Sequence, residues 1–435
     1  MTGQRDAVPA VRDLAAARLR DEAADATSGH DPEAIREHAR HVITQAVHDY
    51  ADGLTFAGQP GLDPAAEADI AIAVWDEIYG LGRLQPLLDD PYTETVDVNG
   101  CDEVWVNRAD GTKIKADPVA DTDEQLIEMV RRWGAWQGST ARDFSEARPR
   151  MQLSLRGGYR LGAVMRVTPR PSLSIRCHRM LDADLDLITA NGTITPEAAA
   201  LLAAAVRARK DIVITGGMAA GKTTMLRALA GEFDPDERIA TVEHDYELFL
   251  HKFPDKHRDV LAMQVREANA EGAGAVTMTT CIKDALWMNA RRIIVGEVRG
   301  EELLPMLEAM NTGGDGSLCT LHADSAGQVF TRMLVCAETS GLSIPPASLF
   351  RIAGMAVDFI VHLDHRGKQR YVSQISEVLP PADTIEPAVN QVFQPDHQNT
   401  RAIPCTAPQC LPDLEAAGYD PAPFAATAWE QVRQP

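Results

Sequence analysis

The chain has 435 residues, 45% of them hydrophobic, so it can bury a sizeable core, and its length favours two or three domains. The formal net charge of −21 argues against nucleic acid as the main partner, because sequence-independent binding to a phosphate backbone depends on Lys and Arg. No run of about 18 uninterrupted apolar residues exists, and the N-terminus lacks the apolar centre of a signal peptide. We therefore expect a cytoplasmic protein without direct membrane insertion. The seven cysteines include no C-x-x-C pair, which argues against a disulfide framework or a structural zinc site.

The pattern of apolar residues divides the chain into four segments. Residues 1–60 are rich in Ala and charge with helical periodicity, and they predict a helical N-terminal extension. Residues 61–190 begin with a helix and continue with short β-like runs around one helical stretch, which predicts an α+β domain. Residues 191–380 alternate short apolar strands with helices, the pattern of a parallel sheet covered by helices. Residues 381–435 hold much of the Pro and predict a loosely ordered or docking tail.

The stretch "DIVITGGMAAGKTTMLRALA", residues 211–230, predicts a buried strand, a glycine-bounded loop and a helix. Gly216, Gly221, Lys222 and Thr223 satisfy the pattern G-x-x-x-x-G-K-S/T in that context. In such a loop the backbone N–H groups surround phosphates, the lysine supplies a point charge, and the hydroxyl can hold Mg²⁺. The sequence therefore predicts a nucleotide site with these residues: Gly216, Gly217, Met218, Ala219, Ala220, Gly221, Lys222, Thr223 and Thr224.

Two later apolar runs end in a carboxylate. "RIATVEHDYEL" ends its strand at Glu243, with Glu247 four residues on, and "RRIIVGEVRG" carries Glu297. At the carboxyl ends of neighbouring parallel strands, Glu243 could polarise an attacking water and Glu297 could position a carboxylate for the metal shell. For either glutamate alone, a solvated strand end is the alternative. "GGDGSLCTLHADS" places His322 after a Gly-rich turn and a short strand, and a lone histidine is more often structural than catalytic.

In this order the segments resemble the secretion-ATPase superfamily that drives type II and type IV secretion and type IV pili, most closely its tight-adherence (Tad) pilus branch. The resemblance covers roughly residues 75–380 and is carried by "LGRLQPLLDDPYTETVDVNGCDEVWV", "GGMAAGKTT" at the Walker A loop, "VEHDYEL" at the aspartate box, "RIIVGEVRG" at Walker B, "MNTGGDGSLCTLHADS" at the histidine box and "VDFIVHL". It implies an α/β fold with a RecA-like P-loop ATPase core, preceded by an α+β domain. It also implies a homo-hexameric ring that binds ATP and Mg²⁺ between the two domains of each subunit. Hydrolysis of ATP to ADP and phosphate would then move an inner-membrane platform protein of a pilus or secretion machine, and contact with the membrane would come through partners.

The resemblance also implies roles for single residues. Glu243 resembles the catalytic glutamate, Glu297 the Walker B acid that shares the metal with Thr223, and His322 the histidine-box residue. Charge that builds up on a transferred phosphoryl group needs cationic partners. Three arginines complete the expected catalytic set: Arg160 in "GGYRLGAV", Arg176 in "SLSIRCH", and Arg299 after Walker B. A surface role explains Arg160 or Arg176 nearly as well.

Some positions depart from the family pattern. His244 stands where the aspartate box normally has Asp, and Ala219 lacks glycine's freedom at positive φ. Three sites that are usually arginine hold other residues: Thr279, Trp287 and Asn289. Two alternatives to the motor therefore stay open. One is a nucleotide-binding scaffold or regulator with weak hydrolysis; the other is a conjugation-type DNA-transport ATPase, against which the net charge of −21 weighs.

Overall fold

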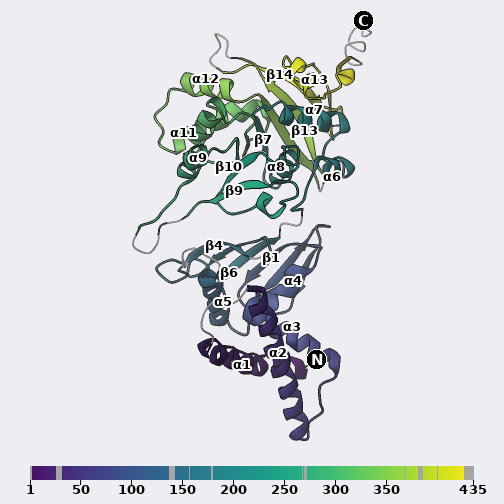
Figure 1. The fold of residues 1–435 in the computed structure, drawn as a ribbon, viewed down its shortest axis with the longest axis vertical. Coiled ribbons are helices and arrows are strands. Elements are labelled where there is room, and N and C mark those ends of the chain that lie inside the picture. Colours follow the sequence, from purple (N-terminus) through teal and green to yellow (C-terminus); the bar gives the residue numbers. More distant parts are fainter. Residues whose placement is uncertain are drawn as a thin grey trace. The chain divides into compact units, whose positions relative to one another are not determined.

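The computed structural model describes residues 2–25, 32–136, 143–155, 157–177, 180–266, 268, 272–367, 369–380, 386–398 and 400–425. The chain forms two compact units, Met1–Cys177 and His178–Pro435, drawn in purple to blue and in teal to yellow in Figure 1. Within the described residues, no helix combines the length and the apolar character needed to cross a membrane.

The first unit begins with three helices around a small apolar core. Ile43 and Ile70 are almost fully buried in it. The last of the three helices begins where the side chain of Asp63 accepts a hydrogen bond from Ala66 N, directly before a proline whose missing N–H costs nothing in the first turn. The three helices are α1 (Thr2–Asp25), α2 (Pro32–Phe56) and α3 (Pro64–Tyr79).

A six-stranded antiparallel sheet forms the rest of the first unit, in the order β3-β2-β1-β6-β5-β4. Side chains alternate along each strand, so Leu161 and Ile175 face a core that they share with Trp133, while the opposite face is polar. The elements after α3 are η1 (Gly82–Leu84), α4 (Gln85–Asp89), β1 (Thr93–Asn99), β2 (Val104–Arg108), β3 (Lys113–Ala116), α5 (Asp123–Trp136), β4 (Arg150–Leu155), β5 (Tyr159–Val164) and β6 (Ser172–Cys177).

The second unit is built on a nine-stranded sheet in the order β15-β14-β13-β12-β7-β11-β10-β8-β9. The strands from β12 to β9 run parallel, and β13, β14 and β15 continue the sheet antiparallel. The central strand β7 is one apolar run because both faces of the sheet are covered: Ile214 packs into one core and Val213 into the other. The strands are β7 (Ile212–Gly216), β8 (Arg238–Glu243), β9 (Asp259–Gln264), β10 (Arg292–Val298), β11 (Leu318–Leu321), β12 (Phe359–Arg366), β13 (Gln369–Val378), β14 (Val389–Pro395) and β15 (Ala402–Pro404).

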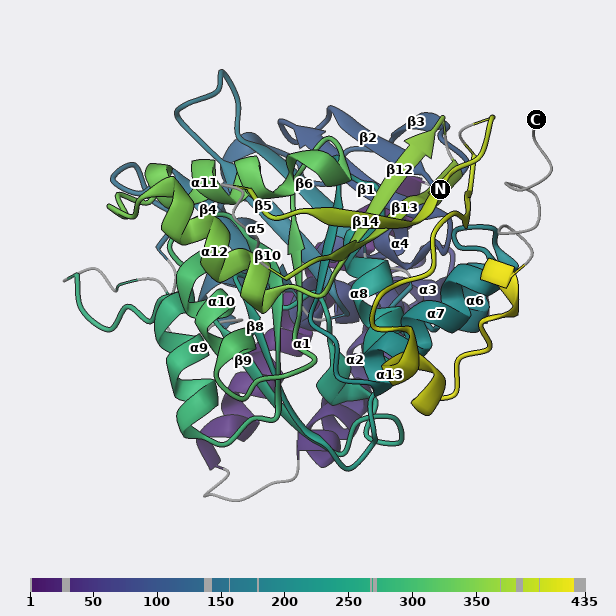
Figure 2. The ribbon, with the colours of Figure 1, turned by 90° about the horizontal axis from the view of Figure 1, so that it is seen from above.

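Helices cover both faces of this sheet, and Figure 2 shows α6, α7, α8 and α13 on one side and α9, α10, α11 and α12 on the other. With the sheet order, this arrangement confirms the predicted α/β fold with a RecA-like core. The helices are α6 (Leu185–Ala190), α7 (Pro196–Arg207), α8 (Lys222–Ala230), η2 (Leu250–Lys252), α9 (Met278–Trp287), α10 (Leu303–Asn311), η3 (Ala326–Gln328), α11 (Val329–Thr339), α12 (Pro346–Ala356) and α13 (Leu411–Ala416).

The structure differs from the sequence expectations at two places. The first unit ends at Cys177 rather than near residue 190, because Leu185 and Ile188 of α6 pack into the core of the second unit. The segment 381–435, expected to be loosely ordered, instead supplies β14 and β15, and Phe393 is buried against the same core. Residues 381–385, 399 and 426–435 of that segment lie outside the described residues.

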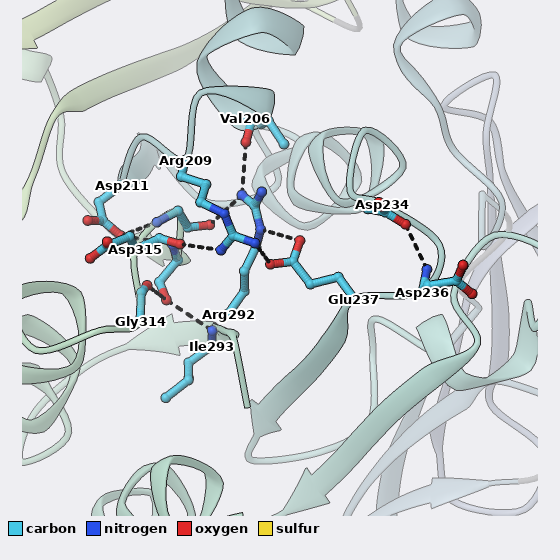
Figure 3. Close-up of polar contacts among 12 residues, drawn as sticks. Val206, Arg209, Asp211, Asp234, Asp236, Glu237, Arg292, Ile293, Gly314 and Asp315 are labelled. Carbon is cyan, nitrogen blue, oxygen red and sulfur yellow. Dashed lines mark hydrogen bonds and ion pairs between the residues drawn. The ribbon is translucent and has the colours of Figure 1, made fainter. Parts of the chain in front are cut away.

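Buried charges join the amino ends of the central strands, as Figure 3 shows. Arg292, the first residue of β10, forms a buried ion pair with Glu237 at 2.9 Å, and Glu237 also pairs with Arg209. Asp211, just before β7, accepts hydrogen bonds from Gly316 N at 3.1 Å and Ser317 N at 2.8 Å. Burial, helped by the nearby Asp358, raises the pKa of Asp211 to about 9, so this carboxyl is protonated at neutral pH. Polar contacts therefore stabilise the amino ends of the strands, and a site can form at their carboxyl ends.

Candidate active site

The loop between β7 and α8 has the backbone geometry that a phosphate-binding loop requires. Gly216 has a φ of 151°, and a Cβ at this position would lie 2.4 Å from the backbone oxygen of Leu363 on β12. Gly221 has a φ of 97° and is the N-cap of α8. No side chain caps α8, so its first N–H groups, which point along the helix axis into the loop, are left for an anion. A side chain at Gly216 would collide with β12, and the positive φ of Gly221 would strain any other residue there.

The residues between the two glycines take different positions. Met218 is 81% exposed, Ala220 is buried, and a Cβ added to Gly217 would meet nothing within 4 Å. Ala219 adopts a φ of 59°, in the left-handed region. That conformation costs an alanine about 1 kcal/mol relative to glycine, so the loop carries some strain at the position where the sequence analysis noted the missing glycine.

Lys222 lies inside this loop with only 7% of its surface exposed. Its Nζ donates hydrogen bonds to Gly216 O at 2.9 Å and to Gly217 O at 2.8 Å, and it lies 3.1 Å from Nδ1 of His322. Burial lowers the pKa of Lys222 to about 8, against the opposing effect of Glu297. The ammonium group is thus held in the loop, close to the end of β11.

Glu297, His322 and Arg299 form a connected group beside Lys222. His322 Nε2 lies 3.2 Å from Glu297 Oε1, and Arg299 Nη2 lies 2.7 Å from Glu297 Oε2. Burial alone would raise the pKa of Glu297, but the hydrogen bond and charge of Arg299, with the charges of His322 and Lys222, lower it. Burial and the charge of Lys222 lower the pKa of His322. Because Nδ1 accepts from the lysine, the neutral ring carries its proton on Nε2, the nitrogen that lies toward Glu297.

Glu243, the last residue of β8, is only 3% exposed. Its Oε1 accepts hydrogen bonds from Glu247 N and Leu248 N, both at 3.0 Å, while Oε2 has no hydrogen-bond partner among the described residues. Burial raises the pKa of Glu243 to about 8. The neighbouring strand makes room for this side chain, since a Cβ on Gly296 would lie 3.1 Å from Glu243 Cγ. Glu243 is thus a buried carboxyl with one oxygen fixed by two N–H groups and the other, also buried, without a hydrogen-bond partner among the described residues.

Thr223, expected to hold a metal together with Glu297, contacts a different carboxylate. Its hydroxyl donates to Glu247 Oε2 at 3.4 Å. Across the part of the chain that the structure describes, no three His, Cys, Asp or Glu side chains are grouped as a metal cage. A hydroxyl with nearby carboxylates still suits Mg²⁺, which is usually held by one or two protein oxygens together with substrate phosphates. Thr223, Glu247 and Glu297 are the residues that would provide such oxygens.

The structure brings most of the predicted site residues together at the carboxyl ends of the parallel strands. Gly216, Glu243, Glu297 and His322 lie at or just after the carboxyl ends of β7, β8, β10 and β11, which are neighbours in the sheet. The carboxyl edge of an open α/β sheet is where ligands bind in such folds. Thr224, in the first turn of α8, is half-buried.

Two predicted residues belong to the first unit. Arg160 on β5 and Arg176 on β6 are direct partners in the strand register, on the polar face of the antiparallel sheet. Two arginines side by side give this face a local positive charge.

Most positions that depart from the family pattern lie on the surface, and Thr279 is half-buried. His244 is exposed, and the next residue, Asp245, is buried and accepts from Gln264 Nε2 at 3.3 Å. Trp287, at the end of α9, is 93% exposed, and Asn289 follows it with a φ of 64°.

The sequence analysis missed three residues that shape the site. Gly296 makes room for Glu243, Leu363 lies against Gly216, and Arg227 is buried on α8 with its guanidinium donating to Glu247 O. For Arg227, the only signal in the sequence was its position one helical turn after Thr223. Its hydrogen-bond partner could not be identified without the fold.

Comparisons with known proteins identify the family of the chain. The sequence profile of a family described as "Type II/IV secretion system protein" matches residues 140–363, about half of the chain. A protein of Mycobacterium tuberculosis (strain ATCC 25618 / H37Rv), whose name assigns it to conjugal transfer, is 36% identical over 304 residues, covering 68% of this chain and 83% of that protein. The type IV secretion system protein VirB11 of Brucella suis biovar 1 is 30% identical over 336 residues, covering 68% of this chain and 89% of that protein.

Solved structures of similar proteins were also found. The VirB11 ATPase of the Brucella suis type IV secretion system, in complex with sulphate, is 26% identical and covers 72% of this chain and 96% of that chain, with a TM-score of 0.36. The pilus retraction motor PilT with bound ADP is 16% identical and covers 69% of this chain and 83% of that chain, with a TM-score of 0.49. On the matched profile and the sequence identities, the chain belongs to the type II/IV secretion system protein family.

Proposed function

We propose that this chain is a Mg²⁺-dependent motor that hydrolyses ATP to ADP and phosphate to drive a secretion or pilus machine. The observation that carries the proposal is the contact of Lys222 with His322, and of His322 with Glu297, beside the cradle of Gly216 and Gly221. This arrangement combines phosphate binding with acids at the carboxyl ends of neighbouring strands, which phosphoryl transfer to water needs.

Different residues perform different parts of the proposed hydrolysis. The N–H groups at the start of α8 and the Lys222 ammonium bind the phosphates, and Thr223 holds Mg²⁺ together with them. Thr223 and the nearby carboxylates would hold Mg²⁺, which when bound would supply positive charge to the transferred phosphoryl group. Oε2 of Glu243, which has no hydrogen-bond partner among the described residues, is the proposed acceptor of a proton from the attacking water, and the raised pKa of about 8 places its action as a base at mildly alkaline pH. His322 accepts from Lys222 at Nδ1 and lies beside Glu297, and so links the lysine to this carboxylate.

The larger assembly follows from the family resemblance. As a member of the Tad pilus branch, the chain would form a homo-hexamer at the cytoplasmic side of the inner membrane and act on a platform protein. Arg160 and Arg176 of the first unit would supply cations to the nucleotide. Whether pilus assembly, pilus retraction or secretion is powered depends on that partner.

Two other functions have a specific observation in their favour. His244 in the aspartate box and the strained Ala219 favour a nucleotide-controlled regulator with weak hydrolysis. The relative named for conjugal transfer favours a DNA-transport motor, but the net charge of −21 argues against it. A salt-dependent shift of DNA mobility by the purified chain would support the DNA motor.

The deciding experiment is Mg²⁺-dependent ATP hydrolysis by the purified chain, with ring formation followed by light scattering. We expect turnover that Glu243→Gln lowers by about 100-fold or more while nucleotide binding persists, because the variant removes the general base. Glu308→Gln, on the exposed side of α10, is the matched control and should retain activity. Tight ATP binding without turnover in the assembled ring, restored by His244→Asp, would contradict the motor and favour the regulator.

A further inference from the structure

Arg227 is a buried arginine on the helix that follows the phosphate loop. Only 4% of its surface is exposed. It lies four residues after Thr223 on α8, so both side chains project from the same face of the helix, one turn apart. The position of Arg227 thus depends directly on the helix that binds the phosphates.

Both of these side chains hold Glu247. The Thr223 hydroxyl donates to the Glu247 carboxylate at 3.4 Å, and Arg227 Nη2 donates to the backbone oxygen of the same residue. The other terminal nitrogen, Nη1, donates to Met180 O at 2.8 Å. Met180 lies in the segment between β6 and α6, directly before the core of the second unit begins. One guanidinium therefore joins α8, the turn after β8 and this connecting segment.

The turn held in this way is the one that orients Glu243. The N–H groups of Glu247 and Leu248 both donate to Oε1 of Glu243 at 3.0 Å. These two bonds fix one carboxylate oxygen, and the other has no hydrogen-bond partner among the described residues. A displacement of the turn by Arg227 would therefore move the carboxylate itself.

The bonding of Arg227 suggests more than a packing role. Burying a charge is costly unless it is compensated. Its two terminal nitrogens donate to backbone carbonyls, and its Nε has no hydrogen-bond partner among the described residues. The carboxylates that act on its charge are Glu243 and Glu247. The positive charge is thus placed beside the carboxyl that the proposed reaction needs ionised.

We propose that Arg227 is a positioning residue that holds the turn at Glu247 against α8 and so keeps the Glu243 carboxylate in the orientation that the proposed reaction needs. Through Met180 the same guanidinium makes this arrangement sensitive to the segment that follows the first unit. The inference rests on the proposed function for its effect on turnover. The series of contacts from Arg227 through the turn at Glu247 to Glu243 can be tested without turnover.

The test compares Arg227→Gln and Arg227→Lys with the wild-type full-length chain. Amide hydrogen exchange is measured at peptides that contain Glu247 and Leu248, together with kcat and KM for ATP. We expect faster exchange of these two amides in Arg227→Gln, and a loss of kcat of about 10- to 100-fold with KM changed less than about threefold, because a small misplacement of a reacting group can cost that much. Arg227→Lys keeps the charge but lacks the fork, so it should recover part of the loss.

Arg207→Gln is the matched control, because Arg207 pairs with Glu232 at 3.4 Å and is half-exposed on α7. Its exchange and turnover should match those of the wild-type chain. Unchanged exchange at Glu247 and Leu248 in Arg227→Gln would overturn the proposal, as would kcat and nucleotide binding that fall together. If the wild-type chain showed no turnover, the motor would fail, and the exchange data would still decide the role of Arg227.

Discussion

Replacing Gly216 by alanine tests whether the loop and β12 are packed as the structure indicates. The added Cβ would lie 2.4 Å from Leu363 O and 3.1 Å from the Ala220 Cβ, so the loop or the strand must shift. Overpacking of this kind costs about 1–3 kcal/mol. The φ of 151° adds a backbone cost of about 1–3 kcal/mol for any residue other than glycine. We take a total destabilisation of about 3 kcal/mol, in the lower half of the range that these two costs add up to. At about 2–4 °C per kcal/mol, this lowers Tm by about 6–12 °C.

Thermal unfolding followed by circular dichroism measures this effect, and binding of a fluorescent ATP analogue should weaken in the same variant. Gly217→Ala is the matched control, because a Cβ at that position meets nothing within 4 Å. We expect its Tm to lie within about 2 °C of the wild-type value, as most substitutions in open positions change stability little. If Gly216→Ala unfolded at the same temperature as Gly217→Ala, the close approach of β12 to the loop would be refuted.

Two more predictions concern the amino ends of the strands. The folded-state pKa of Asp211, about 9, lies above its ordinary value, so its contribution to stability is complete at acid pH and is lost as pH rises toward 9. Asp211→Asn keeps the acceptor for Gly316 N, so its free energy of unfolding should fall less between pH 6 and 9 than that of the wild-type chain. Denaturant titrations measure both values, and an equal fall with pH in the two proteins would argue against a protonated Asp211. Arg292→Met leaves the buried Glu237 short of a partner and should cost about 3–5 kcal/mol, whereas Arg238→Met, at an exposed pair, should cost about 1 kcal/mol or less; similar urea midpoints would contradict this difference.

The α/β class was predictable because its signals are local. The apolar run of Ile212, Val213 and Ile214 has no polar alternation, which indicates a strand covered on both faces, and glycines mark the loop after it. The strands at the end of the chain were not predictable in the same way. Val392 and Phe393 are two apolar residues in a segment rich in proline, and only the unpaired edge of β13 gives them a sheet to join.

The candidate site was likewise predictable only in part. Sequence motifs located Lys222, Glu243 and Glu297, because the pattern of each lies within a few residues. The partners of these side chains come from distant segments: the space for Glu243 depends on Gly296, and the turn that orients it is held by Arg227. Such contacts follow from how strands and helices pack in three dimensions, and a single sequence contains no local trace of them.

The antiparallel strands that close the chain also limit how it can be shortened. β14 forms the ladder along β13, with Phe393 opposite Ile375. A chain that ended near residue 380 would leave the backbone groups of that edge without their partners. Unpaired strand edges attract edges of other molecules, so the shortened protein would tend to self-associate there. Any multimer of the shortened protein would reflect association at this exposed strand edge rather than the subunit contacts of the proposed ring.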